Sequence, residues 1–162
     1  GLTWVRRTDA PSTKDASADV ILLDTIGELP ATYSLSTIVF VGGSIIQRGG
    51  HNVLEPASVG ACVVTGHNTQ NFRAIVQLLL EGQAIVQLPP VDPQKAAPCL
   101  THTLDELLKN QQERLELGKR ARRIVEENQG TADRTISLIR PLFIQSSEAL
   151  NTIFTASAKT NP

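Results

Sequence analysis

Five short runs of hydrophobic residues recur along this 162-residue chain, and they constrain its fold more than any other feature. They lie at residues 2–7, 20–23, 37–41, 61–65 and 84–88. Hydrophobic side chains follow one another in these runs instead of alternating with polar ones. This pattern is typical of parallel strands that are buried on both faces. The runs therefore predict five strands of a parallel sheet.

The segments between these runs suit crossover helices. In residues 71–81, Phe72, Ile75, Val76 and Leu79 fall on one helical stripe, and Gly82 follows as a stop signal. Residues 8–18, rich in Pro, Ser, Thr and Asp, predict a loop. Alternation of strand and helix indicates an α/β fold with a Rossmann-like parallel sheet, flanking helices and right-handed crossovers.

The pattern becomes all-helical from residue 103. We expect a short helix, then a second one ending near residues 128–130, and then a third that Thr131 caps and Pro141 kinks or ends. The apolar positions expected to mark these three helices are Leu104, Leu107 and Leu108; Leu115, Ile124 and Val125; and Ile136, Ile139 and Phe143. The expected organisation is an α/β region at 1–102, helices of the same domain at 103–150, and a polar tail at 151–162.

Composition excludes several classes of function. The chain is 41% hydrophobic and carries a formal charge of −1, so no basic face for nucleic acid is expected. Aromatic residues make up 4%, too few for a base-stacking platform. No apolar run is long enough to span a membrane, and Cys62 and Cys99 lack metal-ligand spacing, so we expect a soluble chain in a reducing compartment. Cys62 is expected to be a buried apolar residue of its strand. Because the chain contains no methionine and begins at Gly1, we expect it to be a fragment.

The strongest chemical signal lies at residues 40–57, which read Phe-Val-Gly-Gly-Ser-Ile-Ile-Gln-Arg-Gly-Gly-His-Asn-Val-Leu-Glu-Pro-Ala. A strand enters a double glycine, a loop reaches a second double glycine, and a helix is expected from about Asn52. Ligands bind at the carboxyl edge of parallel sheets, and the first turn of a helix favours phosphate. This predicts a phosphorylated ligand near Ser44 and residues 49–52. The alternative is a plain turn, with Asn52 and Glu55 forming a capping box.

Two further segments follow predicted strands. Residues 24–29, Asp-Thr-Ile-Gly-Glu-Leu, end the second strand and open a helix, where Glu28 would suit the helix dipole and Thr25 an N-cap. Residues 66–72, Gly-His-Asn-Thr-Gln-Asn-Phe, follow the fourth strand. This last segment is either part of a ligand site or a polar loop that caps the next helix. We expect the loops at residues 24–29 and 40–57 to emerge on the same side of the sheet.

These three segments, in this order, resemble the carboxyl-terminal half of the Kdo transferases, which are two-domain glycosyltransferases of the GT-B architecture. The matching residues are 24–29, 40–44, 48–52 with Leu54 and Glu55, and 66–72; the late Asn-Gln-Gly at 128–130 also matches. The likeness covers roughly residues 1 to 145. It implies that this domain holds the CMP moiety of the donor CMP-Kdo.

The resemblance assigns roles to individual residues. It implies that Glu55 grips the ribose, and that Asn52 with the backbone of Gly43, Gly49 and Gly50 holds the phosphate. Ile26, Gly27 and Glu28 would line the nucleotide or sugar pocket. Ser44 and Arg48 would meet the donor's phosphate or carboxylate. His51 is open between a phosphate contact and structural hydrogen bonding.

The family's domain begins with a further strand and helix, so we expect a sheet with a gap or a rearranged strand. The acceptor domain with its catalytic carboxylate is also outside this chain, so no catalytic residue is expected here and the chain alone should be inactive. The implied reaction transfers Kdo to a lipid A precursor in lipopolysaccharide synthesis, in a parent enzyme peripheral to or anchored at the cytoplasmic side of the bacterial inner membrane. No metal, cofactor or nucleic acid is expected. The alternatives are another GT-B nucleotide-sugar enzyme, such as a UDP-sugar transferase or an epimerase, and a non-catalytic Rossmann-like binding module.

Overall fold

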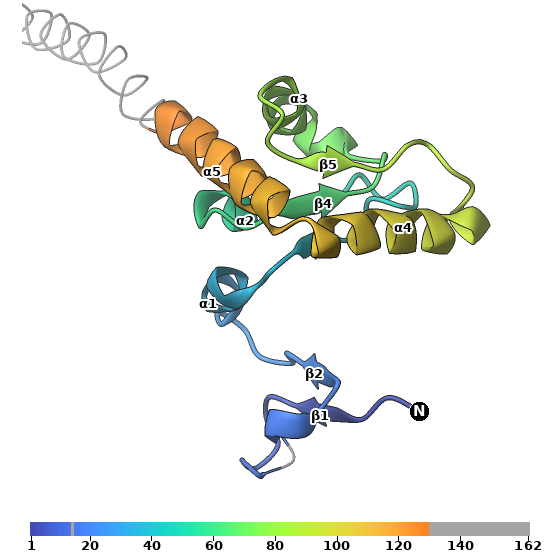
Figure 1. Cartoon of the computed structure of the whole chain (residues 1–162), viewed down its shortest axis with the longest axis vertical. Helices are drawn as coiled ribbons and strands as arrows, with labels where there is room; N and C mark the ends of the chain where they lie inside the picture. Colours follow the sequence, from blue (N-terminus) through green and yellow to red (C-terminus); the bar gives the residue numbers. More distant parts are fainter. Residues whose placement is uncertain (14, 130–162) are drawn as a thin grey trace, which may run out of the picture. The chain divides into compact units, whose positions relative to one another are not determined.

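The computed structural model describes residues 1–13 and 15–129. The chain divides into two units, Gly1–Glu126 and Glu127–Pro162, and the first of them holds both the core and the candidate site. The expected third helix and the polar tail lie outside the described residues. Figure 1 labels the elements: β1 (Trp4–Arg6), β2 (Val20–Leu22), α1 (Leu29–Leu35), β3 (Val39–Val41), α2 (Leu54–Ser58), β4 (Val63–Thr65), α3 (Arg73–Glu81), β5 (Val86–Gln87), α4 (Ala96–Lys109) and α5 (Gln111–Asn128). Short 3₁₀ helices occupy Asp15–Ser17, Gln70–Phe72 and Pro93–Lys95.

The strands form two parallel sheets instead of one. β1 pairs with β2, with Val5 opposite Ile21. The second sheet has the order β3-β4-β5, with Phe40 opposite Val64 and Thr65 opposite Gln87. Each predicted run contains a strand, and the parallel direction is confirmed. The break between β2 and β3 agrees with the expected gap in the sheet.

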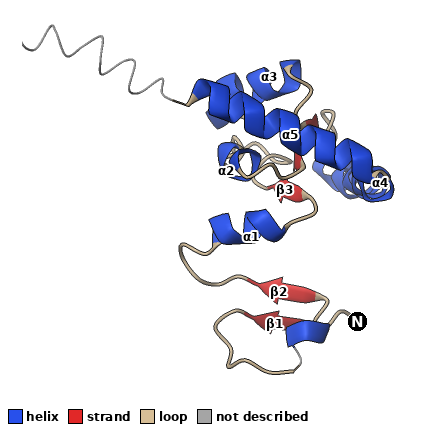
Figure 2. Cartoon of the chain, turned by 60° about the vertical axis from the view of Figure 1, so that its left-hand side comes forward, coloured by secondary structure: helices blue, strands red, loops and turns tan. Residues whose placement is uncertain are grey.

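The three-stranded sheet carries the hydrophobic core. Val63 and Val64 of β4 are fully buried and point to opposite faces. Val63 belongs to a cluster with α3 and Ala121 of α5, and Val64 to a cluster with α4 and Leu117 of α5. Burying each valine stabilises the fold by about 1.5–3 kcal/mol. Helices therefore cover β4 on both faces, and Figure 2 shows α2, α3, α4 and α5 grouped around the neighbouring β3.

The first 35 residues differ from this core. We expected their strands to be buried on both faces, and this was wrong: β1 has one half-buried residue, β2 is exposed throughout, and α1 buries no residue fully. Trp4 is 59% exposed and Ile21 60%. The sequence of a continuous apolar run does not distinguish a buried strand from an exposed one, because burial depends on which other elements cover the strand.

The helical stripe of α3 is confirmed, since Val76 and Leu79 are buried and Phe72 and Ile75 pack against the same cluster. The buried faces expected for α4 and α5 are only partly correct. Leu107, Ile124 and Val125 are buried, but Leu108 is 57% exposed and Leu115 51%. The buried stripe of α5 consists of Leu117, Gly118, Ala121, Ile124 and Val125.

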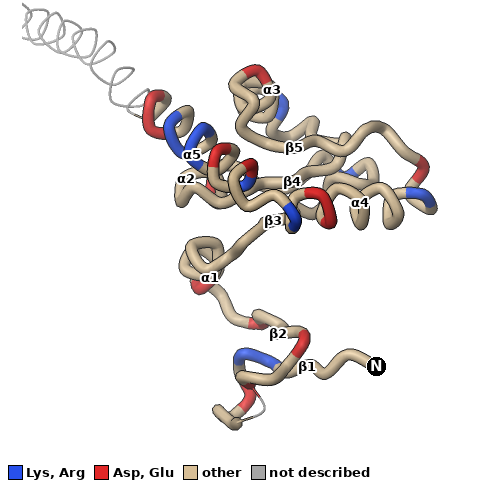
Figure 3. The backbone as a smooth tube through the Cα atoms, in the orientation of Figure 1, with Lys and Arg blue, Asp and Glu red and all other residues tan. Residues whose placement is uncertain are grey.

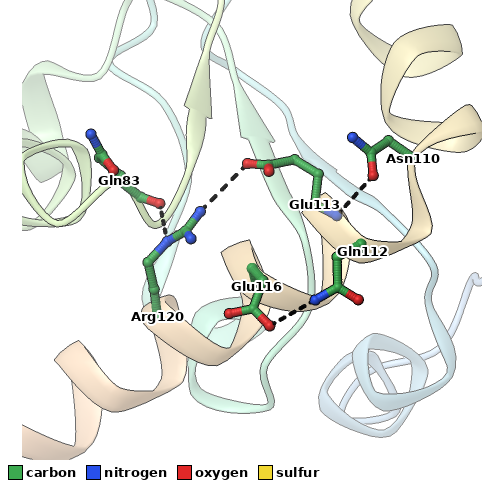
Figure 4. A network of polar contacts seen from close by, with 6 residues as sticks. All are labelled: Gln83, Asn110, Gln112, Glu113, Glu116 and Arg120. Atoms are coloured by element: carbon green, nitrogen blue, oxygen red, sulfur yellow. Dashed lines mark hydrogen bonds and ion pairs between the residues drawn. The ribbon is translucent and has the colours of Figure 1, made fainter.

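α5 is attached to the rest of the unit by polar contacts as well as by packing. Figure 4 shows Arg120, whose Nε donates to the carbonyl oxygen of Gln83 at 2.6 Å and whose Nη2 lies 3.5 Å from Oε1 of Glu113. The N–H of Glu113 donates to Oδ1 of Asn110 at 3.0 Å, which caps the start of the helix. Charged residues follow one another along α5, whereas β3, β4 and β5 carry none (Figure 3).

Candidate functional site

The loop between β3 and α2 is attached to the loop after β4. The N–H of Asn68 donates to the carbonyl oxygen of Ser44 at 2.8 Å, and its Nδ2 donates to that of Ile45 at 3.0 Å. Farther along, the N–H of Asn71 donates to the carbonyl oxygen of Gly49 at 3.0 Å, and its Nδ2 to that of Arg48 at 3.2 Å. The two asparagines of the 66–72 segment thus fix the path of the glycine-rich loop.

Two glycines are required by this close packing. A Cβ on Gly66 would lie 2.3 Å from the carbonyl oxygen of Ser44. A Cβ on Gly49 would lie 2.5 Å from Cγ of Asn71, and the φ of Gly49 is +88°, a conformation that other residues rarely adopt. The loops could not approach this closely with larger residues.

The glycine-rich loop also closes on itself. The N–H of Gly50 donates to the carbonyl oxygen of Gly43 at 3.0 Å, and that of His51 donates to the carbonyl oxygen of Gly42 at 3.1 Å. The imidazole of His51 lies against Gly43, where an added Cβ would be 3.2 Å from Nε2. Two N–H groups that the sequence suggested for phosphate are therefore occupied by protein acceptors, and the His51 side chain packs on the double glycine.

Ser44 lies in the interior and not at a ligand surface. It is 0% exposed, its hydroxyl donates to the carbonyl oxygen of Val41 at 2.6 Å, and it accepts the N–H of Gly66 at 2.8 Å. This geometry joins the end of β3 to the end of β4 and opposes the expected contact with a donor phosphate. Arg48, by contrast, is exposed, as a ligand contact requires.

Asn52 and Glu55 are linked directly. Nδ2 of Asn52 donates to Oε1 of Glu55 at 3.0 Å, and Oδ1 of Asn52 accepts the N–H of Leu54 at 3.0 Å. The two side chains interact, but they do not form the expected capping box, because the five-residue helix begins at Leu54, its N-cap is Val53 and no side-chain cap hydrogen bond is present. Glu55 is exposed, and in the described part of the chain no hydrogen bond to its Oε2 occurs.

The segment at 24–28 is bound to the end of β1. The carboxylate of Asp24 accepts the N–H and the hydroxyl of Thr8 at 3.2 and 2.7 Å. Nη2 of Arg7 lies 3.0 Å from Oε1 of Glu28, whose other carboxylate oxygen accepts the hydroxyl of Thr25. The Thr25 hydrogen bond and then the Arg7 charge lower the pKa of Glu28.

Thr25 therefore does not cap α1, because its hydroxyl donates to Glu28 and the helix begins at Leu29 with Glu28 as its N-cap. Ile26 is completely exposed, at 103%, and Gly27 beside it is exposed as well. These two residues form no part of the core, so their side of the loop is accessible to a ligand.

α1 connects this segment to α2. It starts directly after Glu28 and contacts α2, and its Tyr33 packs against the buried cluster that includes Val53 and Ala57. Burial, followed by the negative charge of Glu55, raises the pKa of Tyr33. Tyr33 therefore lies near Glu55, and α1 joins the segment at 26–28 to the helix that carries Glu55, although the two segments follow strands of different sheets.

A cavity of about 540 Å³ opens where β3, β4 and β5 end. It is lined by the loop residues Ile45, Ile46 and Gln47, by Gly66, His67 and Asn68, and by the segment after β5 at Leu88–Val91 and Pro93. Among the described residues no group of three His, Cys, Asp or Glu side chains has the arrangement of a metal site. None of the described helices has the length and apolar composition of a membrane span.

No protein-family model matches the chain. A curated 3-deoxy-D-manno-octulosonic acid transferase from Haemophilus influenzae is 36% identical over 125 residues, which are 77% of this chain and 28% of the relative. The corresponding enzyme from Bordetella pertussis is 33% identical over 89 residues, 55% of this chain and 21% of the relative. The crystal structure of the C-terminal CMP-Kdo binding domain of WaaA from Acinetobacter baumannii superimposes with a TM-score of 0.65, at 31% identity over 76% of this chain and 61% of that chain. This chain is a homologue of the Kdo transferases.

As a Kdo transferase homologue, the chain has the α/β fold of the C-terminal domain of a GT-B glycosyltransferase. It spans about a quarter of the length of the curated transferases that it matches. Arg7, Thr8 and Tyr33 contact or lie near the predicted site residues, although no motif in the sequence marks them. The signal for Arg7 and Thr8 was their position at the end of the first predicted strand, at the same edge as residues 24–28.

Proposed function

We propose that the chain is the donor-binding domain of an enzyme that transfers Kdo from CMP-Kdo to a lipid A precursor in lipopolysaccharide synthesis. The observation that carries the proposal is the likeness, in both fold and sequence, to a solved CMP-Kdo binding domain. The curated transferases at 33–36% identity support it.

Glu55 is proposed to hold the ribose. Its Oε1 is occupied by Asn52, which fixes the side chain, and its Oε2 is left to accept a ribose hydroxyl. This arrangement makes Asn52 a positioning residue for Glu55 as well as a neighbour of the phosphate. Exposed Ile26 and Gly27, together with Glu28, would line the pocket for the nucleotide or sugar.

The proposed phosphate contacts differ from those that the sequence suggested. Since the N–H groups of Gly50 and His51 are occupied and Ser44 is buried, we assign the anionic groups of the donor chiefly to Arg48, with Gly43 and Gly49 shaping the loop that presents it. Guanidinium is planar and always charged, and it pairs with phosphate or carboxylate through two parallel hydrogen bonds.

In the proposed reaction an acceptor hydroxyl attacks the anomeric carbon of Kdo. A carbon–oxygen bond forms to the acceptor, the bond from that carbon to the phosphate oxygen of CMP breaks, and the hydroxyl proton passes to a base in the remainder of the parent enzyme. This chain stabilises the charge that develops on the leaving phosphate. On its own it binds donor without turnover. The parent enzyme would act at the cytoplasmic side of the inner membrane, peripheral to it or anchored there.

The proposal is tested by calorimetric titration of the chain with CMP and with UMP. We expect CMP to bind more tightly, and Glu55→Gln to weaken its binding. A Gln side chain retains the hydrogen bond to Asn52 but loses the charged acceptor. Glu81→Gln, an exposed glutamate at the end of α3, serves as the matched control and should leave CMP binding unchanged. If the folded chain bound neither nucleotide, or bound UMP as tightly as CMP, the proposed donor would be wrong.

A further inference from the structure

Arg7 lies directly after β1, beside the segment at 24–28. Its backbone N–H donates to the carbonyl oxygen of Leu22 at 2.9 Å, so the pairing of β1 with β2 fixes the position of the residue. Its guanidinium then reaches Glu28, with 3.0 Å between Nη2 and Oε1. The cation is thereby held at the carboxyl edge of the two strands, where α/β sheets bind their ligands.

The ion pair between Arg7 and Glu28 is not needed for the stability of the fold. The two hydrogen bonds from Thr8 to Asp24 already attach the end of β1 to the end of β2. The side chains of Arg7 and Glu28 remain 55% and 38% exposed, and ion pairs that exposed contribute little to the free energy of folding. A more direct effect of the pair is to fix the orientation of a guanidinium that remains accessible.

The local charges show what this guanidinium would recognise. Asp24 and Glu28 are both acidic, so without a nearby cation this edge would repel an anionic donor. The neighbouring Arg6 also acts on this edge, since its charge, after a side-chain hydrogen bond, contributes to the lowered pKa of Asp24, but its guanidinium lies over the ring of Trp4, 5.7 Å from the centroid. Arg7 has five N–H donors, and among the described residues only its Nη2 meets a carboxylate.

We propose that Arg7 is a donor-binding residue, held by Glu28 so that its remaining N–H groups engage an anionic oxygen group of CMP-Kdo, either the phosphate or the sugar carboxylate. This inference rests on the proposed function and adds to it a residue from the end of β1. It also gives Glu28 a defined task, which is to orient Arg7 and not to contact the ligand's anionic groups.

The test is to titrate the whole chain with cytidine, CMP and free Kdo, comparing Arg7→Gln with Arg6→Gln. The two variants lose the same charge at adjacent residues, of which Arg7 pairs with Glu28 and Arg6 lies over the ring of Trp4. If Arg7 contacts the phosphate, Arg7→Gln weakens CMP binding about tenfold or more and leaves cytidine binding unchanged. If it contacts the carboxylate, the loss is confined to Kdo. Arg6→Gln should match the wild type for all three ligands.

Arg7→Lys adds a second readout. It retains the charge but not the planar fork, so we expect CMP or Kdo affinity between those of wild type and Arg7→Gln. Equal affinities of wild type and Arg7→Gln for both CMP and Kdo would overturn the inference while leaving the proposed function standing. A wild-type chain that binds neither CMP nor Kdo would instead overturn the proposed function, and the inference with it.

Discussion

Replacing Ser44 by alanine removes a hydroxyl that has two partners in the interior. The hydroxyl donates to the carbonyl oxygen of Val41 and accepts the N–H of Gly66. Ser44 is 0% exposed and Gly66 is buried, so water does not replace the lost partner without a rearrangement of the loops. Alanine leaves an amide unpaired at the end of β4.

These contacts set how far Ser44→Ala lowers the free energy of unfolding. Each hydrogen bond contributes about 0.5–1.5 kcal/mol, and leaving a buried donor unpaired costs about 1–3 kcal/mol. These terms overlap, so we expect Ser44→Ala to lower the free energy of unfolding by about 2–3 kcal/mol. Ser58→Ala is the control, because its hydroxyl donates to the carbonyl oxygen of Glu55 at an exposed position where water can take its place.

The measurement is urea unfolding followed by circular dichroism, with the midpoint and slope fitted for each variant. The predicted loss for Ser44→Ala is several times that for Ser58→Ala, which we expect to be about 0.5 kcal/mol or less. If the two variants lost the same stability, Ser44 would not join β3 to β4 as described. A stable Ser44→Ala variant with weakened CMP binding would restore Ser44 as a ligand contact.

Three other perturbations have defined expected outcomes. Gly118→Ala places a Cβ 2.0 Å from the carbonyl oxygen of Gly60. Despite the better helix propensity of alanine, this variant should be less stable by about 1–3 kcal/mol in thermal unfolding, whereas Lys119→Ala should keep the stability of the wild type. Burial raises the pKa of the Cys62 thiol to about 11 from an ordinary 9.0. Iodoacetamide at pH 8 should therefore label Cys99 first, and rapid labelling of Cys62 in the folded chain would contradict this. The free energy of unfolding should also fall as the pH rises from about 9 to 11. The pKa of Asp24 is lowered, mainly by the Thr8 hydroxyl, so the contribution of Asp24 to folding stability is present above about pH 4 and is lost on acidification below that. Below about pH 4, hydrogen exchange at the Thr8 amide should therefore speed up relative to the Val63 amide in the core.

Much of the fold could be predicted from the sequence because hydrophobic runs locate strands whatever surrounds them. All five runs contain a strand, and α3 has the predicted buried stripe. The exposure of β2 could not be predicted, because an apolar run reads the same whether or not another element covers it. The start of α4 at Ala96 was also missed. Helix was expected only from residue 103, whereas α4 includes Pro98 in its first turn, where the missing N–H breaks no intrahelical hydrogen bond.

The candidate site was predictable by segment but not by atom. The glycines and asparagines at 42–52 and 66–72 were recognised as a group, and the structure brings these two loops together. Which N–H groups are free was not predictable, because Gly50 and His51 donate to carbonyl oxygens several residues away. The interior position of Ser44 likewise depends on the register between β3 and β4, which the motif does not encode.

A cytidine nucleotide is proposed to bind at the loops carrying Gly27, Glu28 and Glu55. At 17.5 kDa the ¹⁵N-labelled chain is small enough for amide NMR, and a CMP titration tests this claim most directly. We predict that the shifted amides cluster at residues 26–28 and 43–55, with those of α5 unaffected. Shifts confined to α5 or to other surfaces away from these loops, or no shifts at saturating CMP, would show that the nucleotide does not bind there.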